Sequence, residues 1–144
     1  MPRTITSTAN TTWQGDLLSG SGTTSLETSQ LASLPVHWKA RSEESGQGTT
    51  SPEELIGAAL ATCYSMAFSN GLAENDTPPT QVDSSAAVSF NAAEGITGIE
   101  LTVSATVPGI EDADFQRLAE DAKANCPVSK ALSGVDITLN ATLS

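Results

Sequence analysis

The sequence predicts an α+β protein made of antiparallel strands and a few helices. Three observations lead to this prediction: a β-prone first third, one long capped helix in the middle, and a pair of alternating stretches followed by helices and a last strand. This order lacks the strand–helix alternation of a parallel α/β fold, and no G-x-G-x-x-G motif occurs. The chain has 144 residues, and we expect residues 1–144 to form one domain.

Three short strands are expected before the long helix, at residues 4–16, 22–30 and 36–41. The first stretch is rich in threonine and ends in a Gly-Asp turn signal. Residues 36–41, "VHWKAR", alternate apolar and polar side chains, so they predict a strand that carries Arg41. Residues 42–50 are polar and contain glycine, which indicates a loop.

The central segment "TSPEELIGAALATCYSMAFSNGL" predicts a helix. Ser51 is placed as the N-cap, Pro52 as the first helical residue, and Glu54 completes an S-x-x-E capping box. One apolar stripe follows helical spacing: Ile56, Ala59, Leu60, Cys63, Met66 and Ala67. Gly57 and the neighbouring alanines keep the helix thin, so another backbone can approach it closely. The pair at 70–71, "NG", is expected to weaken or end the helix.

The last part of the chain predicts a hairpin, two helices and a strand. Residues 81–90 and 96–107 alternate and are joined by "NAAEG". Residues 108–126 predict a helix with one apolar face: Phe115, Leu118, Ala119 and Ala122. Pro127 interrupts that helix and can open a new short one over residues 127–133, with Cys126 as its N-cap. Residues 135–143 predict the final strand.

Composition narrows the possible functions. Seventeen acidic residues against six basic ones give a net charge of −11, which argues against binding to nucleic acid or to anionic membranes. No run of apolar residues approaches a membrane span and the N-terminus lacks a signal peptide, so we expect a cytoplasmic protein without membrane association. Two cysteines and one histidine, His37, do not form the pattern of a zinc or iron–sulfur site.

The two cysteines sit in different predicted environments. An N-cap thiol at Cys126 faces unpaired N–H groups and a helix dipole, which both favour the thiolate. Burial in mid-helix would raise the pKa of Cys63, so that residue would need a cation, and Arg41 is the leading one. Glu53 could orient this arginine, but it lies ~15 Å from Cys63 along one straight helix. Either Arg41 bridges the gap, or a second copy of the helix supplies Glu53, which implies a homodimer.

Plainer interpretations stay open on the residues alone. Free cysteine is among the most buried residue types, so Cys63 is also explained as an inert core residue. Glu53 and Glu54 suit the first turn of a helix whether or not they act on a substrate. Arg41 is equally typical of a solvated strand edge.

Taken together, three segments resemble the OsmC/Ohr family of thiol-dependent hydroperoxide reductases. They are "TSPEELIGAALATCYSMAFSNGL", "VSATVPGIEDADF" and "AKANCPVSKAL", and the resemblance runs from "WQGD" to "ITLNATL". "VPGIE" and "NCPVSKAL" are similar to the OsmC branch. The resemblance implies antiparallel sheets around a long central helix and an intertwined homodimer. It also implies a peroxidatic Cys63, a resolving Cys126, and a pair formed by Arg41 and Glu53.

The function implied by this resemblance is the reduction of organic hydroperoxides, and more weakly of hydrogen peroxide, to alcohols or water. Cys63 would become a sulfenic acid, Cys126 would convert it to a disulfide, and an external dithiol, of lipoyl type in the family, would reduce that disulfide. No metal, haem or flavin is expected. Two alternatives are a non-catalytic redox-sensing or stress-response protein switched by the Cys63–Cys126 pair, and a structural protein with inert thiols.

Overall fold

The computed structural model describes residues 2–43 and 48–144, and the chain divides into two compact units, Met1–Pro52 and Glu53–Ser144. The first unit contains a three-stranded antiparallel sheet, β1(Ala9–Gln14), β2(Ser21–Leu26) and β3(Ser33–Val36), in the order β1-β2-β3. The two strands predicted over residues 4–16 and 22–30 are therefore confirmed, with shorter bounds. That the whole chain is one domain stays a prediction.

The strand predicted over residues 36–41 is wrong beyond its first residue. Helix α1(Trp38–Ser42) follows β3 directly, and Arg41 lies on this helix rather than on a strand. His37 explains the change, because its Nδ1 atom accepts a hydrogen bond from the Lys39 N–H at 3.1 Å and so caps the helix. A six-residue alternation could not reveal this cap. The Arg41 guanidinium lies 6.0 Å from the centre of the Trp38 ring, one helical turn back.

The long central helix is α2(Pro52–Glu74), which begins at the predicted proline. The "NG" pair at 70–71 does not end it, contrary to expectation. The helix ends instead in a Schellman motif, in which Asp76 takes a left-handed conformation with φ of 60°. The Asp76 N–H donates to the Ala73 carbonyl at 3.0 Å, and the Thr77 N–H donates to the Leu72 carbonyl at 3.0 Å.

The second unit continues with a sheet and two further helices. Strands β4(Gln81–Asn91) and β5(Gly95–Thr106) form the predicted antiparallel hairpin, and β6(Ile137–Leu143) pairs with β5 in parallel. This sheet, of order β4-β5-β6, is therefore mixed and not purely antiparallel as expected. Helices α3(Asp112–Asn125) and α4(Pro127–Ala131) lie between β5 and β6 in the chain, which confirms the predicted pair of helices.

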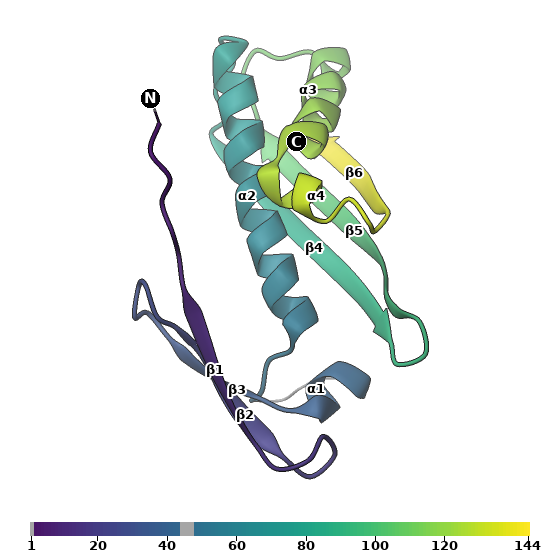
Figure 1. The fold of residues 1–144 in the computed structure, drawn as a ribbon. Helices are drawn as coiled ribbons and strands as arrows, with labels where there is room; N and C mark the ends of the chain where they lie inside the picture. The colour runs from purple at the N-terminus through teal and green to yellow at the C-terminus, as the bar shows by residue number, and fades with distance from the viewer. Residues whose placement is uncertain (1, 44–47) are drawn as a thin grey trace. The chain divides into compact units, whose positions relative to one another are not determined.

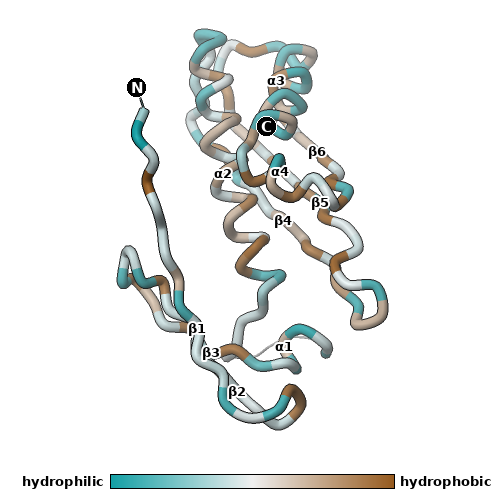
Figure 2. The backbone as a smooth tube through the Cα atoms, in the orientation of Figure 1, coloured by the Kyte–Doolittle hydropathy of each residue, from teal (hydrophilic) through white to brown (hydrophobic). Residues whose placement is uncertain are grey.

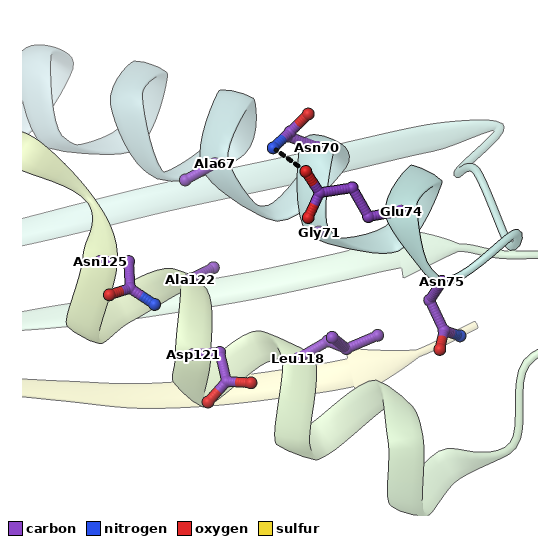
Figure 3. A pocket seen from close by; sticks show the side chains of 9 residues that line it. All are labelled: Ala67, Asn70, Gly71, Glu74, Asn75, Leu118, Asp121, Ala122 and Asn125. Atoms are coloured by element: carbon purple, nitrogen blue, oxygen red, sulfur yellow. Dashed lines mark hydrogen bonds between the residues drawn. The ribbon is translucent and has the colours of Figure 1, made fainter.

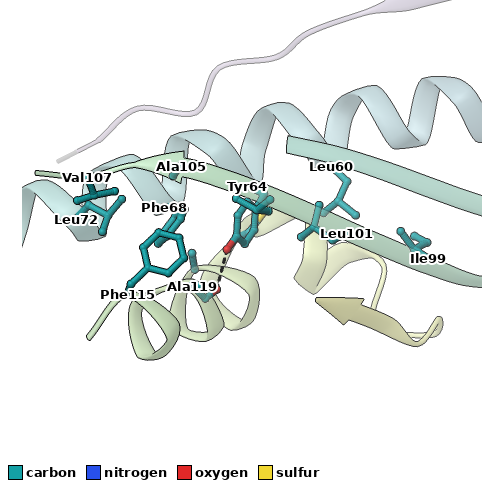
Figure 4. Packing of buried hydrophobic residues seen from close by; sticks show 13 residues of the cluster. Leu60, Tyr64, Phe68, Leu72, Ile99, Leu101, Ala105, Val107, Phe115 and Ala119 are labelled. Atoms are coloured by element: carbon teal, nitrogen blue, oxygen red, sulfur yellow. Dashed lines mark hydrogen bonds between the residues drawn. The ribbon is translucent and has the colours of Figure 1, made fainter. Parts of the chain in front are cut away.

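Helices α2, α3 and α4 lie on one face of the β4-β5-β6 sheet (Figure 1). Alternate residues of β5 point into the core beneath them, while the intervening Glu100 and Thr102 are exposed. The buried apolar cluster, shown in Figure 4, contains Leu60, Tyr64, Phe68, Leu72, Ile99, Leu101, Val103, Ala105, Val107, Phe115, Ala119, Ala122 and Cys126. Cys126, between α3 and α4, is thus part of the core of this unit.

The face that α2 buries differs from the predicted stripe by about one residue. Gly57, Leu60, Tyr64, Phe68 and Leu72 are buried. Ala59 is exposed and Met66 is 68% exposed, although both were expected in the core. The prediction failed because α2 is apolar or weakly polar around most of its circumference, as Figure 2 shows between its hydrophilic ends, so periodicity could not choose the face.

Helix α2 is also long and apolar enough to cross a membrane when judged by length and composition alone. A single helix of this kind is weak support for a membrane span, because the core helix of a soluble protein meets the same criterion. In this structure, Leu60, Phe68 and Leu72 of α2 are fully buried against the sheet and α3.

Gly57 generates a stability prediction, because it lies where α2 approaches β4 closely. A Cβ at this position would stand 2.9 Å from the Ala86 carbonyl oxygen, a backbone atom that cannot easily move. We expect Gly57→Ala to lower the free energy of unfolding by about 1–3 kcal/mol in urea titrations. Gly71→Ala is the matched control on the same helix, where a Cβ meets nothing within 4 Å. It should instead raise stability, by up to about 1 kcal/mol, and equal effects would contradict the packing argument.

Candidate active site

The two cysteines come together inside the second unit. Cys63 lies near the middle of α2 and is partly buried, whereas Cys126, between α3 and α4, is fully buried. Both are free thiols, and their side chains are near enough to shift each other's pKa. Residues that are 63 positions apart in the sequence thus form one pair of sulfur atoms.

Cys126 occupies the junction of two helices. It is the C-cap of α3, where its N–H donates to the Ala122 carbonyl at 2.9 Å, and it is also the N-cap of α4. Pro127 is the first residue of α4, and its lack of an N–H costs nothing at that position. The predicted N-cap position of Cys126 is therefore confirmed.

The environment of this unit favours the thiolate at Cys126 rather than at Cys63. Burial raises the pKa of the Cys63 thiol, and its interaction with Cys126 raises that pKa further. Burial also acts to raise the pKa of Cys126, but the Cys63 thiol and the nearby polar groups of Ser129 and Val128 outweigh it, so the pKa falls. Within this unit, no interaction lowers the pKa of Cys63 enough to offset the effects of burial and of Cys126.

Tyr64, the residue after Cys63, joins α2 to α3. Its hydroxyl donates a buried hydrogen bond of 3.0 Å to the Ala119 carbonyl, in the helix that leads to Cys126 (Figure 4). Phe68 lies one turn further along α2 and packs edge-on against Phe115 of α3, with ring centres 5.3 Å apart. These contacts hold the cysteine-bearing turn of α2 against the helix that ends at Cys126.

The other two predicted site residues are not brought to the sulfur pair by the described contacts. Arg41 belongs to the N-terminal unit, on α1. Glu53 is 6% exposed in the first turn of α2, ten residues before Cys63. A rise of ~1.5 Å per residue separates their backbones by ~15 Å, as the sequence suggested.

Two residues near the sulfurs were missed by the sequence analysis. Tyr64 was missed because periodicity could not identify the buried face of α2, and the predicted apolar stripe included Cys63 but not its neighbour Tyr64. Ser129 lies three residues after Cys126, and its position at the third residue of α4 is the one signal that could have singled it out.

A pocket of about 480 Å³ opens between the C-terminal half of α2 and α3, as Figure 3 shows. Neither cysteine is among its lining residues, which include Asn70, Glu74 and Asp121. The Glu74 carboxylate accepts a hydrogen bond from the Asn70 amide at 3.3 Å, and Asp121 lies 3.8 Å from Arg117. This pocket is therefore separate from the sulfur pair. Within residues 2–43 and 48–144, no group of three or more histidine, cysteine or acidic side chains could hold a metal ion.

Comparison with known proteins gives the family. The model of a family described as OsmC-like protein matches residues 44–140. The chain belongs to this OsmC-like family. Peroxiredoxin OsmC of Escherichia coli (strain K12) is 43% identical to this OsmC-like protein over 131 residues, which cover 89% of this chain and 90% of the relative.

More distant relatives share the fold of this OsmC-like protein. An organic hydroperoxide resistance protein of Xanthomonas axonopodis pv. citri (strain 306) is 32% identical over 96 residues, which cover 65% of this chain and 68% of that protein. Crystal structures of organic hydroperoxide resistance proteins from Legionella pneumophila and Elizabethkingia anophelis superpose with TM-scores of 0.70 and 0.73. Their identities are 23% and 21%; the alignments cover 99% and 100% of this chain and all of both neighbours. The α+β OsmC/Ohr fold is therefore established.

Tyr64 generates a pH prediction for this OsmC-like protein, in which it is the single tyrosine. Burial, followed by the charges of Glu120 and Cys126, raises the pKa of Tyr64 well above its ordinary value of 10.0. The unfolded chain loses this proton near pH 10 but the folded chain retains it, so this contribution to stability is complete below pH ~10 and is lost as pH rises further.

Absorbance at 295 nm should therefore show no tyrosinate until the protein unfolds, and urea midpoints should fall above pH ~10. Tyr64→Phe should remove both the absorbance change and this share of the decline. Reversible ionisation of the folded protein near pH 10 would contradict the assignment.

Proposed function

We propose that this protein is a thiol-dependent peroxidase that reduces organic hydroperoxides, and hydrogen peroxide more weakly. The observation that carries the proposal is the pair of free thiols, Cys63 and Cys126, which the core of one unit brings together. The names of the relatives, peroxiredoxin and organic hydroperoxide resistance protein, support a peroxidase role. Partial exposure of Cys63 and full burial of Cys126 favour Cys63 as the residue that meets the peroxide.

In the first step, the Cys63 thiolate attacks the terminal oxygen of the hydroperoxide. An S–O bond forms and the O–O bond breaks, so Cys63 becomes a sulfenic acid and the substrate leaves as an alkoxide that takes a proton to become an alcohol. Sulfur is oxidised by two electrons and the peroxide is reduced by two. With hydrogen peroxide, the leaving product is water.

In the second step, the Cys126 thiolate attacks the Cys63 sulfur. The S–S bond forms as the S–O bond breaks, and hydroxide leaves as water after it takes a proton. The lowered pKa of Cys126 supplies the nucleophile for this step. An external dithiol, of lipoyl type by family resemblance, then reduces the disulfide by exchange and is itself oxidised. A reducing compartment such as the cytoplasm suits this cycle.

We assign the activation of Cys63 to Arg41, with Glu53 to orient the guanidinium. The surroundings of Cys63 in its own unit raise its pKa, so a thiolate there requires a positive charge from outside that unit. Arginine suits this role because its planar fork can also hydrogen-bond the peroxide and stabilise the departing oxygen. Whether Arg41 and Glu53 act on their own subunit's Cys63 depends on the assembly.

We propose a homodimer in which α2 of one chain packs against α2 of another. The exposed side of α2 is built from small or apolar residues, Ala58, Ala59, Thr62 and Met66. Burying a face of this kind against a second helix is more favourable than leaving it exposed to water. Cys63 lies one helical turn from both Ala59 and Met66, so its sulfur would lie at or near this interface. We expect no resident metal, haem or flavin and no contact with nucleic acid or membranes.

Steady-state kinetics with cumene hydroperoxide and a dithiol test the proposed activity. Cys63→Ser should reduce turnover to the rate of the uncatalysed reaction, because the remaining thiol, Cys126, is fully buried and cannot meet the peroxide. Cys126→Ser should still consume about one equivalent of peroxide per chain before it stalls or depends on direct reduction of the sulfenic acid.

Two results would refute the peroxidase proposal. One is full turnover in Cys63→Ser. The other is oxidation of the wild-type cysteine pair without repeated turnover in the presence of dihydrolipoamide or a thioredoxin-type reductant, which would instead support the redox-sensing protein.

Sedimentation equilibrium tests the dimer. Met66→Asp places a charge on the exposed side of α2 and should weaken self-association by tenfold or more, since an unpaired buried charge costs several kcal/mol. Ala124→Asp is the control, because it adds the same charge at an exposed position of α3. Dissociation by both variants, or by neither, would argue against an α2–α2 interface.

A further inference from the structure

Ser129 is a buried polar residue that the mechanism above does not use. It lies in α4 and is 8% exposed. Its hydroxyl oxygen is buried and has no hydrogen-bond partner of standard geometry among the residues that the structure describes. Such a hydroxyl destabilises a folded protein, because it loses its bonds to water without replacement. Alanine would avoid this cost and leave only the space of one oxygen atom, so packing alone does not explain the serine.

The position of Ser129 in α4 directs its hydroxyl toward Cys126. Ser129 is the third residue of a helix whose N-cap is Cys126, and a polar side chain at that position reaches back toward the N-cap residue. The backbone groups of Cys126 already have partners within the helices. The Cys126 N–H donates to the Ala122 carbonyl at 2.9 Å, and the Cys126 carbonyl accepts from the Lys130 N–H at 3.0 Å. The Ser129 side chain interacts with the Cys126 sulfur, three residues earlier in the chain.

The reduced thiol and the thiolate differ in what they offer this hydroxyl. A neutral thiol is a weak acceptor, and Cys126 as a thiol makes no capping hydrogen bond. A thiolate carries a full charge and accepts hydrogen bonds strongly. The Ser129 side chain acts to lower the pKa of Cys126, as do the N–H groups of Ser129 and Val128. The hydroxyl is thus placed for the charged state of Cys126 rather than for the neutral one.

We propose that Ser129 is a positioning residue that donates a hydrogen bond to the Cys126 thiolate in the two steps of the cycle where that thiolate reacts. This inference rests on the proposed peroxidase cycle. In resolution, the Cys126 sulfur attacks Cys63, an S–S bond forms, and hydroxide leaves from Cys63 and becomes water. In reduction, a thiolate of the external dithiol attacks the Cys63 sulfur, the S–S bond breaks, and Cys126 leaves with the electron pair.

The leaving step gives the hydroxyl its clearest role. Thiol–disulfide exchange is faster when the leaving sulfur has a lower pKa, so the sulfur of lower pKa is the preferred leaving group. A hydroxyl that stabilises Cys126 as it departs therefore directs the reductant to Cys63, the more exposed of the two sulfurs. Among the described residues, the titratable side chains that interact with Cys126 are Cys63 and Tyr64, both from α2. In the disulfide Cys63 carries no proton, and the Tyr64 hydroxyl donates to the Ala119 carbonyl, so neither replaces the serine as a donor.

Titration of the thiolate in a Cys63→Ser background tests the hydrogen bond directly, with no peroxide present. Absorbance at 240 nm against pH reports Cys126 alone, since it is then the single cysteine. Ser129→Ala should raise the measured pKa of Cys126 by about one unit, and Ser129→Thr, which keeps the hydroxyl, should restore most of the shift. Ser133→Ala is the matched control, because Ser133 is an exposed serine four residues further along the chain.

Rapid kinetics on the wild-type cysteine pair test the role in the cycle. Ser129→Ala should slow the reduction of the disulfide by dihydrolipoamide about threefold, whereas Ser133→Ala, the exposed control, should leave this rate unchanged. The Ser129→Ala variant should unfold at the same temperature as wild type or higher, because it loses no partnered hydrogen bond, so a folding defect cannot imitate this result.

The outcomes separate this inference from the proposed function. An unchanged pKa of Cys126 in Ser129→Ala overturns the hydrogen bond, whether or not the protein is a peroxidase. A raised pKa without any slowing of disulfide reduction overturns the role in the cycle. A wild-type protein that does not turn over peroxide refutes the proposed function, while the titration of Cys126 still decides on the hydrogen bond.

Discussion

The packing of α2 against α3 and the β4-β5-β6 sheet is the constraint on which the sulfur pair depends. Leu60, Phe68 and Leu72 fix the rotation of α2 about its axis, and the Tyr64–Ala119 hydrogen bond fixes its height along α3. Cys63 is carried on the turn that these contacts hold, and Cys126 is held at the end of α3. A sulfur pair so placed needs no flexible loop to bring its two members together.

This arrangement divides the chemistry between the two sulfurs. The helix junction at Cys126 provides N–H groups and a hydroxyl that favour its thiolate, while the environment of Cys63 favours the neutral thiol. A peroxidatic role for Cys63 therefore depends on a charge supplied by the N-terminal unit or by a second chain. If the second chain of the proposed homodimer supplies this charge, an unassembled chain would carry a less reactive Cys63.

The sequence allowed most of the fold to be predicted, because helix caps, proline positions and strand alternation are local signals. The hairpin, the start of α2 and the N-cap position of Cys126 all followed from such signals. Two features depended on tertiary contacts and could not. The buried face of α2 was misplaced because its other face is also apolar, and Arg41 was placed on a strand because the cap provided by His37 is invisible to periodicity. The unpartnered hydroxyl of Ser129 likewise appears only once burial is known.

The most direct test of the central claim is intact-mass analysis of the reduced protein after one equivalent of tert-butyl hydroperoxide, followed by peptide mapping without reductant. The account predicts a mass loss of about two hydrogens and a Cys63–Cys126 linkage within one chain, since both sulfurs lie in the same unit. A stable sulfenic acid on Cys63, or a disulfide between two chains in its place, would contradict it.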